Sequence, residues 1–407
     1  MDAEHITSFT RGERVASIEI SEIVQISEAA ARKRAAGEPV ITLGTGEPDF
    51  DTPDHVKQAA VDAIWAGDTK YPATRGNPPL VDAILAKFSR ENGLTFERDQ
   101  IIVSAGAKQI LFNAQMASLS AGDEVIVPAP YWTTYLDMVT VCGGRPHVVT
   151  CSAENGFKLT PEQLEAAINA NTRWLLLNTP GNPSGAVYSV AEMRALGAVL
   201  ERHKRVWLMV DEIYEHIVYG ADGFTSALQT LPQLADRMLI VNGVSKAYAM
   251  TGWRLGYGAG PAPLIKAMAV VQGQATSGAC SISQAAATAA LNGNQDFLTE
   301  RCASFRDRRD MMVAALNQSS GLSCQMPEGA FYLYPSCQGV LGLKTPAGDV
   351  LASDADFCAY LLDAHGVAVV PGRAFGLPGH FRLSYAYSKE LLESAAASIR
   401  AACGALR

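Results

Sequence analysis

The sequence predicts an α/β fold in which a large domain with a mostly parallel sheet is joined to a smaller, discontinuous α+β domain. Strand and helix patterns alternate over residues 53–292, which is typical of βα units. The chain has 407 residues, 48% of them hydrophobic, whereas a single core stops growing at about 250 to 300 residues. A helical pattern over residues 296–316, rich in Arg and Asp, is therefore expected to connect two domains.

We expect the large domain to span residues 53–295 and the small domain to combine residues 1–52 with 296–407. A helical stretch over residues 18–36 would pack against the C-terminal part, which makes the small domain discontinuous. The strands expected in the small domain cover residues 329–334, 367–370 and 381–386.

The first motif of the large domain follows the strand pattern Ile101-Ile102-Val103. Small residues come next, and a helical pattern begins near Gly106, Ala107 and Lys108. Backbone N–H groups at a helix N-terminus form a cradle for a phosphate group. This signal is weak when it is taken alone.

The second motif, Asn178-Thr179-Pro180-Gly181-Asn182-Pro183-Ser184-Gly185, follows a strand-like apolar run. Its prolines and glycines predict a rigid loop at the strand end. An asparagine held there, such as Asn182, can bind a ligand oxygen; the alternative is an ordinary turn asparagine.

The third motif starts with the unbroken apolar run Trp207-Leu208-Met209-Val210, as expected for a strand buried on both faces. Asp211 follows at its carboxyl end, where open α/β sheets bind their ligands. Alternatively, Asp211 could only cap the helix that follows the strand.

The acidic run with Glu212, Glu215 and His216 could also indicate a metal site. No second His or Cys cluster supports that interpretation, so we expect no metal.

The fourth motif, residues 245–254, brings a hydroxyl, an amine and a guanidinium into one glycine-containing turn. Lys246 can form a Schiff base with an aldehyde, while Ser245 and Arg254 can bind phosphate oxygens. Pyridoxal 5'-phosphate carries both groups. The alternative is a solvated lysine that follows a serine by chance.

Taken together, these motifs resemble the fold type I aminotransferases that use pyridoxal phosphate, and within them the class I aspartate aminotransferase family. The similarity extends from residues 44–53, through Tyr131-Trp132 and the asparagine loop, to residues 329–332 and 381–386. It is greatest to the bacterial aspartate/prephenate branch, which the insertion at residues 340–354 also resembles. The resemblance implies a large cofactor-binding domain with a mostly parallel sheet of about seven strands.

The resemblance also implies roles around the cofactor. Lys246 would be the catalytic residue, bound to the cofactor aldehyde and moving the proton. Asp211 would pair with the ring nitrogen, Tyr214 and Asn182 with the ring oxygen, and Trp132 would stack on the ring or else anchor the core. The groups implied around the phosphate are Ser245, Arg254, the backbone at Gly106, Ala107 and Lys108, and Tyr71 of the partner subunit. This last role implies a homodimer with shared active sites, although Tyr71 could instead be a turn residue.

Substrate binding is implied for Arg382, which would grip the α-carboxylate with help from the Gly46 backbone, unless it forms a surface ion pair. Trp132 and Asn182 would also contact the substrate, and Lys108 would meet the distal carboxylate of aspartate or glutamate. The expected reaction moves the amino group of an L-amino acid, preferably aspartate or glutamate, to 2-oxoglutarate or oxaloacetate by a ping-pong mechanism. Prephenate, aromatic or neutral substrates, or a pyridoxal phosphate lyase on the same scaffold, remain alternatives.

Residues 16–23 depart from the family pattern, which reads Lys-Pro-Ser-Ala-Thr and lines the substrate pocket. Glu19 falls where that lysine would be, and Glu22 and Ile23 replace small and hydroxylated residues. An acid in a dry pocket would repel an anionic substrate by about a few kcal/mol, unless Glu19 faces solvent. Arg75 could enter the partner's pocket and restore affinity for acids, or could be a solvated turn arginine.

Composition excludes other classes of function. The net charge of −8 argues against nucleic-acid binding, and no strand is followed by the Gly-x-Gly-x-x-Gly of a nicotinamide dehydrogenase. A pyridoxal phosphate-binding regulator would need a winged-helix domain, for which the chain has no residues to spare.

Residues 1–5 carry no export signal and no long apolar run is present, so we expect a cytoplasmic protein without a membrane span. The eight cysteines form no Cys-x-x-Cys pair and are expected to be reduced and mostly buried.

Overall fold

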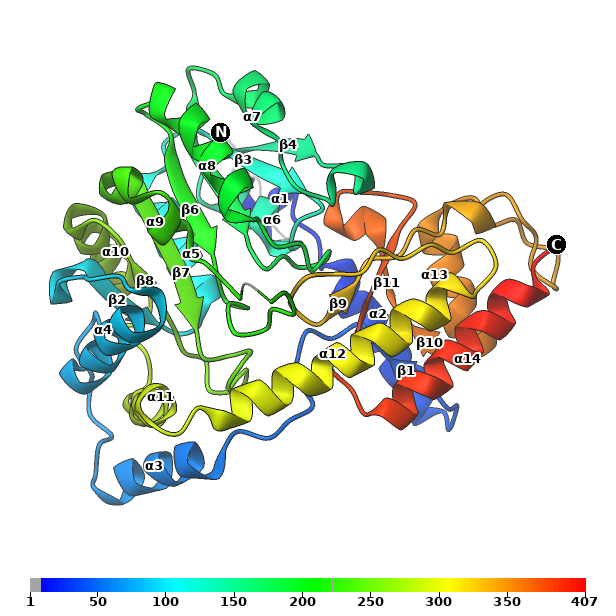
Figure 1. Cartoon of the computed structure of the whole chain (residues 1–407), viewed down its shortest axis with the longest axis horizontal. Helices are drawn as coiled ribbons and strands as arrows, with labels where there is room; N and C mark the ends of the chain where they lie inside the picture. Colours follow the sequence, from blue (N-terminus) through cyan, green and yellow to red (C-terminus); the bar gives the residue numbers. More distant parts are fainter. Residues whose placement is uncertain (1–8, 222) are drawn as a thin grey trace, which may run out of the picture.

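The structure, a computed structural model, describes residues 9–221 and 223–407. It has a large part and a small part, and the long helix α12 (Asp296–Asn317) runs from one to the other (Figure 1). This helix matches the connection expected over residues 296–316. Within the described ranges no helix has the length and apolar character needed to cross a membrane. Residues 1–5, on which the expectation about export rests, lie outside them.

The large part contains a seven-stranded sheet in the order β2-β8-β7-β6-β5-β3-β4. Neighbouring strands are parallel from β7 to β4, whereas β8 runs antiparallel to both β7 and β2. The expected α/β fold with a mostly parallel sheet is therefore confirmed. The strands are β2 (Ile101–Ser104), β3 (Glu124–Ala129), β4 (Arg145–Thr150), β5 (Thr172–Asn178), β6 (Trp207–Asp211), β7 (Met238–Gly243) and β8 (Gly256–Ala259).

Helices cover both faces of this sheet. Along β5, Leu175 and Leu177 enter a core with α4, α8 and α11, whereas Trp174 and Leu176 enter the opposite core with α5 and α10. Burial on both faces explains why the central strands read as unbroken apolar runs. The helices are α3 (Asp54–Trp65), α4 (Pro78–Asn92), α5 (Ala107–Ser118), α6 (Thr134–Val141), α7 (Pro161–Ala167), α8 (Val190–Arg202), α9 (Ala227–Thr230), α10 (Ala262–Ala275) and α11 (Ser281–Asn292).

The small part has its own core around two small sheets. One pairs β1 (Ile41–Thr42) with β10 (Val367–Ala368) in parallel, so the N-terminal segment lies beside the C-terminal one, as expected for a discontinuous unit. The other has the order β11-β12-β9, with β9 (Tyr332–Leu333), β11 (Val370–Pro371) and β12 (Phe381–Ser384). Its helices are α2 (Glu22–Ala35), α13 (Asp354–His365) and α14 (Lys389–Ala405), whereas α1 (Glu13–Ala16) lies against α6 of the large part (Figure 1). The domain bounds at residues 53 and 295 stay a prediction.

Several expected elements of the small part differ in the structure. The strand expected over residues 381–386 ends at Ser384, and the one expected over residues 367–370 is divided between β10 and β11, which belong to different sheets. The strand expected over residues 329–334 is limited to β9, because Ala330 has a φ of 56°, in the left-handed region that no strand can continue through. The helix expected from residue 18 begins at Glu22, after an extended Ser21. All eight cysteines are free, and all but Cys280 and Cys302 are buried.

Candidate active site

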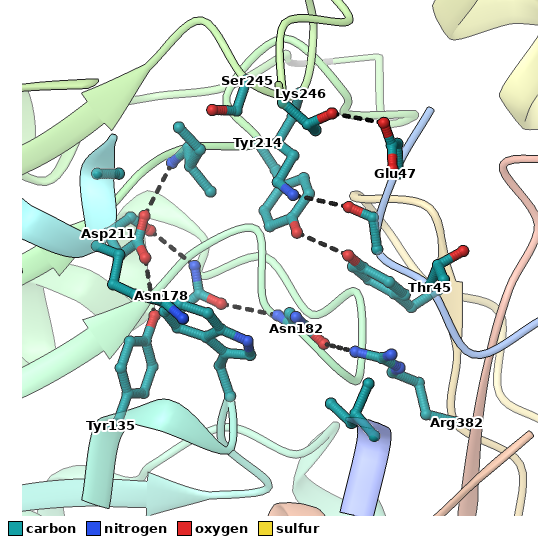
Figure 2. Close-up of a pocket in the computed structure, with 18 of the residues that line it drawn as sticks. Thr45, Glu47, Tyr135, Asn178, Asn182, Asp211, Tyr214, Ser245, Lys246 and Arg382 are labelled. Carbon is teal, nitrogen blue, oxygen red and sulfur yellow. Dashed lines mark hydrogen bonds between the residues drawn. The ribbon is translucent and has the colours of Figure 1, made fainter. Parts of the chain in front are cut away.

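A cavity of about 390 Å³ lies at the carboxyl ends of β5, β6 and β7, facing the small part (Figure 2). It contains all the predicted site residues except Gly106 and Tyr71, and the side chains come from segments distant in the sequence. The lining residues are Ile23, Thr45, Gly46, Glu47, Ala107, Lys108, Trp132, Tyr135, Asn178, Asn182, Asp211, Ile213, Tyr214, Ser245, Lys246, Thr251, Arg254, Tyr332 and Arg382.

Lys246 follows β7 and extends its amine into the cavity. The Nζ atom donates a hydrogen bond to the Gly46 carbonyl at 2.7 Å. Removal from bulk water lowers the pKa of Lys246 to about 8, although the carboxylate of Asp211 acts in the opposite direction. About a tenth of the amine is then neutral at pH 7, far more than for an ordinary lysine, and the neutral form has the nucleophilicity needed to attack a carbonyl carbon.

Asp211 ends β6 and lies opposite Asn178 in the register of β5. Its carboxylate accepts hydrogen bonds from the Tyr135 hydroxyl at 2.8 Å and from the Ile213 N–H at 3.2 Å (Figure 2). Burial raises the pKa of Asp211 to about 6, while these two hydrogen bonds lower it. The carboxylate is therefore charged at pH 7 and can hold a proton on a ligand nitrogen.

A line of hydrogen bonds crosses the cavity from Asp211 to Arg382 (Figure 2). The side-chain amide of Asn178 donates to the Asp211 backbone carbonyl at 2.9 Å, and its oxygen accepts the Asn182 N–H at 2.7 Å. The Asn182 oxygen in turn accepts from Arg382 Nη1 at 3.0 Å. This arrangement fixes the asparagine loop between the two charged residues and leaves the Asn182 amide nitrogen free to donate to a ligand oxygen.

Arg382 lies in β12 and is almost fully buried. Its Nη2 donates to the Gly44 carbonyl, and its guanidinium packs 4.8 Å from the Tyr332 ring centre. Its Nε is buried without a hydrogen-bond partner among the described residues. Because a buried donor on a permanent cation is costly when unpaired, this group is suited to bind an anion such as a carboxylate.

The N-terminus of α5 and Arg254 form a cradle at the other end of the cavity. Gly106 has a φ of 94°, and a β-carbon added there would lie 2.6 Å from Arg254 Nη2. Arg254 itself has a φ of 53°, an uncommon conformation that often accompanies a functional site, and its Nη1 donates to the Thr251 carbonyl at 2.7 Å. With the Ser245 hydroxyl in the same cavity, these groups fit a phosphate.

The aromatic wall is formed by Trp132 and two tyrosines. The Lys108 amine lies 4.7 Å from the centre of the Trp132 ring, and burial, with a smaller contribution from Arg254, lowers the pKa of Lys108. The hydroxyls of Tyr214 and Tyr332 are hydrogen-bonded at 2.8 Å.

The unusual N-terminal acids point away from the cavity. Glu19 is 76% exposed and pairs with Arg11 at 3.4 Å, so in the single chain its carboxylate faces solvent and does not line the cavity. Glu22 pairs with Arg373 at 3.0 Å, whereas Ile23 lines the cavity.

Two predicted cross-subunit residues also lie outside this cavity. Tyr71 is 93% exposed, and Arg75 is exposed and donates to the Asp99 carbonyl at 3.2 Å. Their proposed roles toward a partner subunit are not tested by a single chain.

The cavity residues that were not predicted as site residues from the sequence include Tyr135, Asn178 and Tyr332, whose side chains join the hydrogen bonds of the site. Tyr135 could have been found, because it lies about one helical turn after Trp132, near the start of α6. Asn178 could have been found from the expectation that both strands end at the same edge of the sheet. For Tyr332 the sequence offers no chemical signal.

The acidic run after β6 does not converge on one point. Asp211 faces the cavity, Glu212 accepts from the Ala227 N–H at 2.8 Å, and Glu215 forms an ion pair with Lys87. The ligand atoms of Glu215 and His216 do lie within 4.8 Å of one another and of Glu91, so the expectation of no metal stays a prediction.

Comparison with known proteins adds to this geometry. Residues 38–399 match the family model of the class I and II aminotransferases. The chain is 60% identical over 398 residues to the aspartate aminotransferase of Rhizobium meliloti strain 1021, covering 98% of this chain and 97% of the relative. It is 52% identical to the aspartate/prephenate aminotransferase of Cereibacter sphaeroides, with 96% and 98% covered.

Solved structures give the same result. The crystal structure of the aspartate aminotransferase from Rhizobium meliloti matches with a TM-score of 0.96 and 59% identity, covering 98% of this chain and all of that one. The aspartate aminotransferase from Thermus thermophilus with maleate matches with a TM-score of 0.90 and 39% identity, covering 97% of this chain and all of that one.

Proposed function

The chain belongs to the class I and II aminotransferase family and is a transaminase, and on this premise we propose that its cofactor is pyridoxal 5'-phosphate and its preferred amino donor is aspartate or glutamate. The observation that carries the proposal is the position of the Lys246 amine, which lies in one cavity with the carboxylate of Asp211 and the guanidinium of Arg382.

The residues present fit this cofactor. Arg254, Ser245 and the α5 N-terminus at Gly106 would hold the phosphate. Asp211 would hold a proton at the ring nitrogen, Asn182 and Tyr214 would bind the ring oxygen, and Trp132 would cover the ring. When bound, pyridoxal phosphate would supply an electron sink for the charge that develops at the substrate α-carbon.

The remaining chemistry belongs to the protein. Lys246 would bind the aldehyde carbon, exchange places with the amine of the substrate and then, as the free neutral amine, take the α-proton and deliver it to the cofactor side. Arg382 would orient the α-carboxylate through Nε and a terminal nitrogen, with the Gly46 backbone beside it. A 2-oxo acid would then enter the same site, so the kinetics should be ping-pong.

The preference for a dicarboxylic substrate is inferred from Lys108. Once Arg254 binds the phosphate, Arg382 the α-carboxylate and Lys246 the cofactor, Lys108 is the cation left among the described lining residues for a distal carboxylate. The exposure of Glu19 removes the expected repulsion. 2-Oxoglutarate and oxaloacetate are the corresponding acceptors.

A second candidate is the same reaction on prephenate or an aromatic acid. Ile23 and Trp132 give the cavity apolar surface, and the relative from Cereibacter sphaeroides is named for both aspartate and prephenate. A pyridoxal phosphate lyase is a weaker candidate, and it would release product without any 2-oxo acid acceptor.

We further propose that the protein is cytoplasmic. We also propose that it forms a homodimer in which Tyr71 of one subunit completes the phosphate site of the other. Tyr71 is almost fully exposed in the single chain, and Trp65 on α3 is 85% exposed nearby in the sequence. Large exposed aromatic side chains of this kind are typical of a surface that a partner covers.

The experiment is an absorbance titration of the cofactor-loaded protein with single L-amino acids and no 2-oxo acid. Loss of the visible band with aspartate or glutamate, but not with phenylalanine or alanine, would support both the reaction and the acidic specificity. Lys108→Met should then weaken the response to aspartate more than any response to phenylalanine. Conversion by aromatic amino acids alone would reject the substrate, and absence of any visible band would reject the cofactor.

A further inference from the structure

A buried ionic cluster lies outside the cavity, behind the turn that follows β6. Lys87 of α4 is fully buried, and its amine forms an ion pair with Glu215. The same amine donates to the Asn92 side-chain oxygen at 2.7 Å and lies 3.6 Å from a Glu91 carboxylate oxygen. The buried cation is thus fully compensated, as buried charges must be.

Glu215 is the member of this cluster that joins separate segments. Its Oε2 accepts from the Asn92 amide at 3.1 Å, and its Oε1 accepts from the Asn242 amide at 2.7 Å. Asn92 ends α4, whereas Asn242 lies in β7. Glu215 therefore ties three elements together through side-chain contacts that water does not reach.

These elements carry the residues of the cavity. The turn that contains Glu215 begins with Asp211 and includes Tyr214, and β7 leads through Gly243 to Ser245 and Lys246. Asp211 and Lys246 would act on opposite ends of the same ring, so their separation must be fixed closely.

We propose that Glu215 is a positioning residue for transamination, which holds the Asp211 turn at a fixed distance from the Lys246 segment through Asn242 and anchors both to α4 through Lys87. The inference rests on the proposed pyridoxal phosphate site. Sequence spacing does not reveal it, because Lys87 and Glu215 are distant in the chain.

A cation site is the competing interpretation of the cluster. Ligand atoms of Glu91, Glu215 and His216 lie within 4.8 Å of one another. However, the Lys87 amine contacts the carboxylates of both Glu215 and Glu91, and His216 Nε2 lies 2.9 Å from Glu91. The carboxylates therefore already have their counter-charge, which favours a structural link.

Two variants and one matched control test the proposal. Glu215→Gln removes the negative charge at the centre of the cluster. Asn242→Leu removes the hydrogen bond between Glu215 and β7 but leaves the ion pair between Glu215 and Lys87. Glu212→Gln is the control, because Glu212 is buried in the same turn but bonds toward α9 through Ser226 and Ala227. The readouts are the circular dichroism of the apoprotein, its affinity for added pyridoxal phosphate, the pH midpoint of the visible band, and kcat and KM.

Both variants should stay folded, bind the cofactor more weakly and shift the midpoint of the visible band. The kcat should fall by about 100-fold, the loss that a misplacement of about 1 Å can cause, with a smaller change in KM because Arg382 and Lys108 lie on other elements. The control should behave as wild type. If Glu215→Gln does not fold, Asn242→Leu alone decides.

The proposal is overturned if folded variants keep wild-type affinity, band midpoint and kcat, or if the control loses as much as Glu215→Gln. A wild-type protein that binds no pyridoxal phosphate would instead refute the proposed function on which the inference depends.

Discussion

Replacing Tyr135 by phenylalanine tests the electrostatics of the site most directly. The Tyr135 hydroxyl lies 2.8 Å from Asp211 Oδ2, and it stabilises the charged form of that carboxylate. A hydrogen bond to a charged group contributes about 1.5–3 kcal/mol, and one pKa unit corresponds to about 1.4 kcal/mol. Tyr135→Phe should therefore raise the pKa of Asp211 from about 6 by roughly 1–2 units.

The sign of the pH effect follows from this shift. The charged carboxylate is the form that holds a proton on the ring nitrogen, so binding of pyridoxal phosphate by the wild-type apoprotein should be lost as pH falls through about 6. In Tyr135→Phe the same loss should occur at a pH about 1–2 units higher. The assay is a fluorescence titration of the apoprotein with pyridoxal phosphate at pH values from about 5 to about 9, a range that includes the expected midpoints of both proteins.

Tyr248→Phe is the matched control for this experiment. Tyr248 is equally buried and follows Lys246 by two positions, but its hydroxyl donates to Gln295 at 2.9 Å. Its removal should leave the acid midpoint in place. An unchanged midpoint in Tyr135→Phe, or an equal shift in both variants, would refute the account of how Asp211 is kept charged.

Three further predictions follow from the geometry. Lys246→Ala should still bind the cofactor but show neither the visible band nor turnover, and in the wild type the rate of cofactor capture should rise as pH passes through about 8, where the amine becomes neutral. Arg382→Lys should lower kcat/KM by about 100-fold with a rise in KM, as steady-state kinetics would show, because a lysine cannot replace a bidentate contact worth about 1.5–3 kcal/mol. Glu19→Lys should leave kcat/KM for aspartate within about twofold of wild type, because Glu19 is exposed; a large gain would place it in the pocket.

The strand ends could be predicted from the sequence because their signals are local. Asp211 and the asparagine loop each follow an apolar run directly, and the carboxyl ends of parallel strands meet at one edge of a sheet. The chemistry of Lys246 was also predicted from its local turn. That Lys246 and Arg382 share one site came from the family resemblance, since no local pattern brings residues so distant in the chain together.

The contacts between side chains could not be predicted in this way. Tyr135 meets Asp211 through the packing of α6, which brings its hydroxyl to the end of β6 across 76 positions of the sequence. β9 is shorter than the strand expected over residues 329–334 because Ala330 has a positive φ, which an alanine does not predict. Glu19 was ambiguous because its orientation depends on where α2 begins, and helix ends are poorly defined by sequence.

Two buried polar atoms without partners show how the site differs from the scaffold. Glu212 Oε2 and Arg382 Nε both lack a hydrogen bond among the residues that the structure describes. Burial, followed by the nearby Glu215, raises the pKa of Glu212 to about 8, so at neutral pH this carboxyl is mostly uncharged. Its unpaired oxygen therefore costs less than an unpaired charge would. Arg382 cannot lose its charge in this way, because a guanidinium stays protonated in proteins. The described lining of its cavity has four basic side chains, Arg382 included, against the two carboxylates of Glu47 and Asp211. A ligand with a phosphate and a carboxylate would supply both the missing charge and the missing acceptor. The same reasoning predicts that a dicarboxylic analogue should stabilise the cofactor-loaded protein against heat more than a neutral one of equal size.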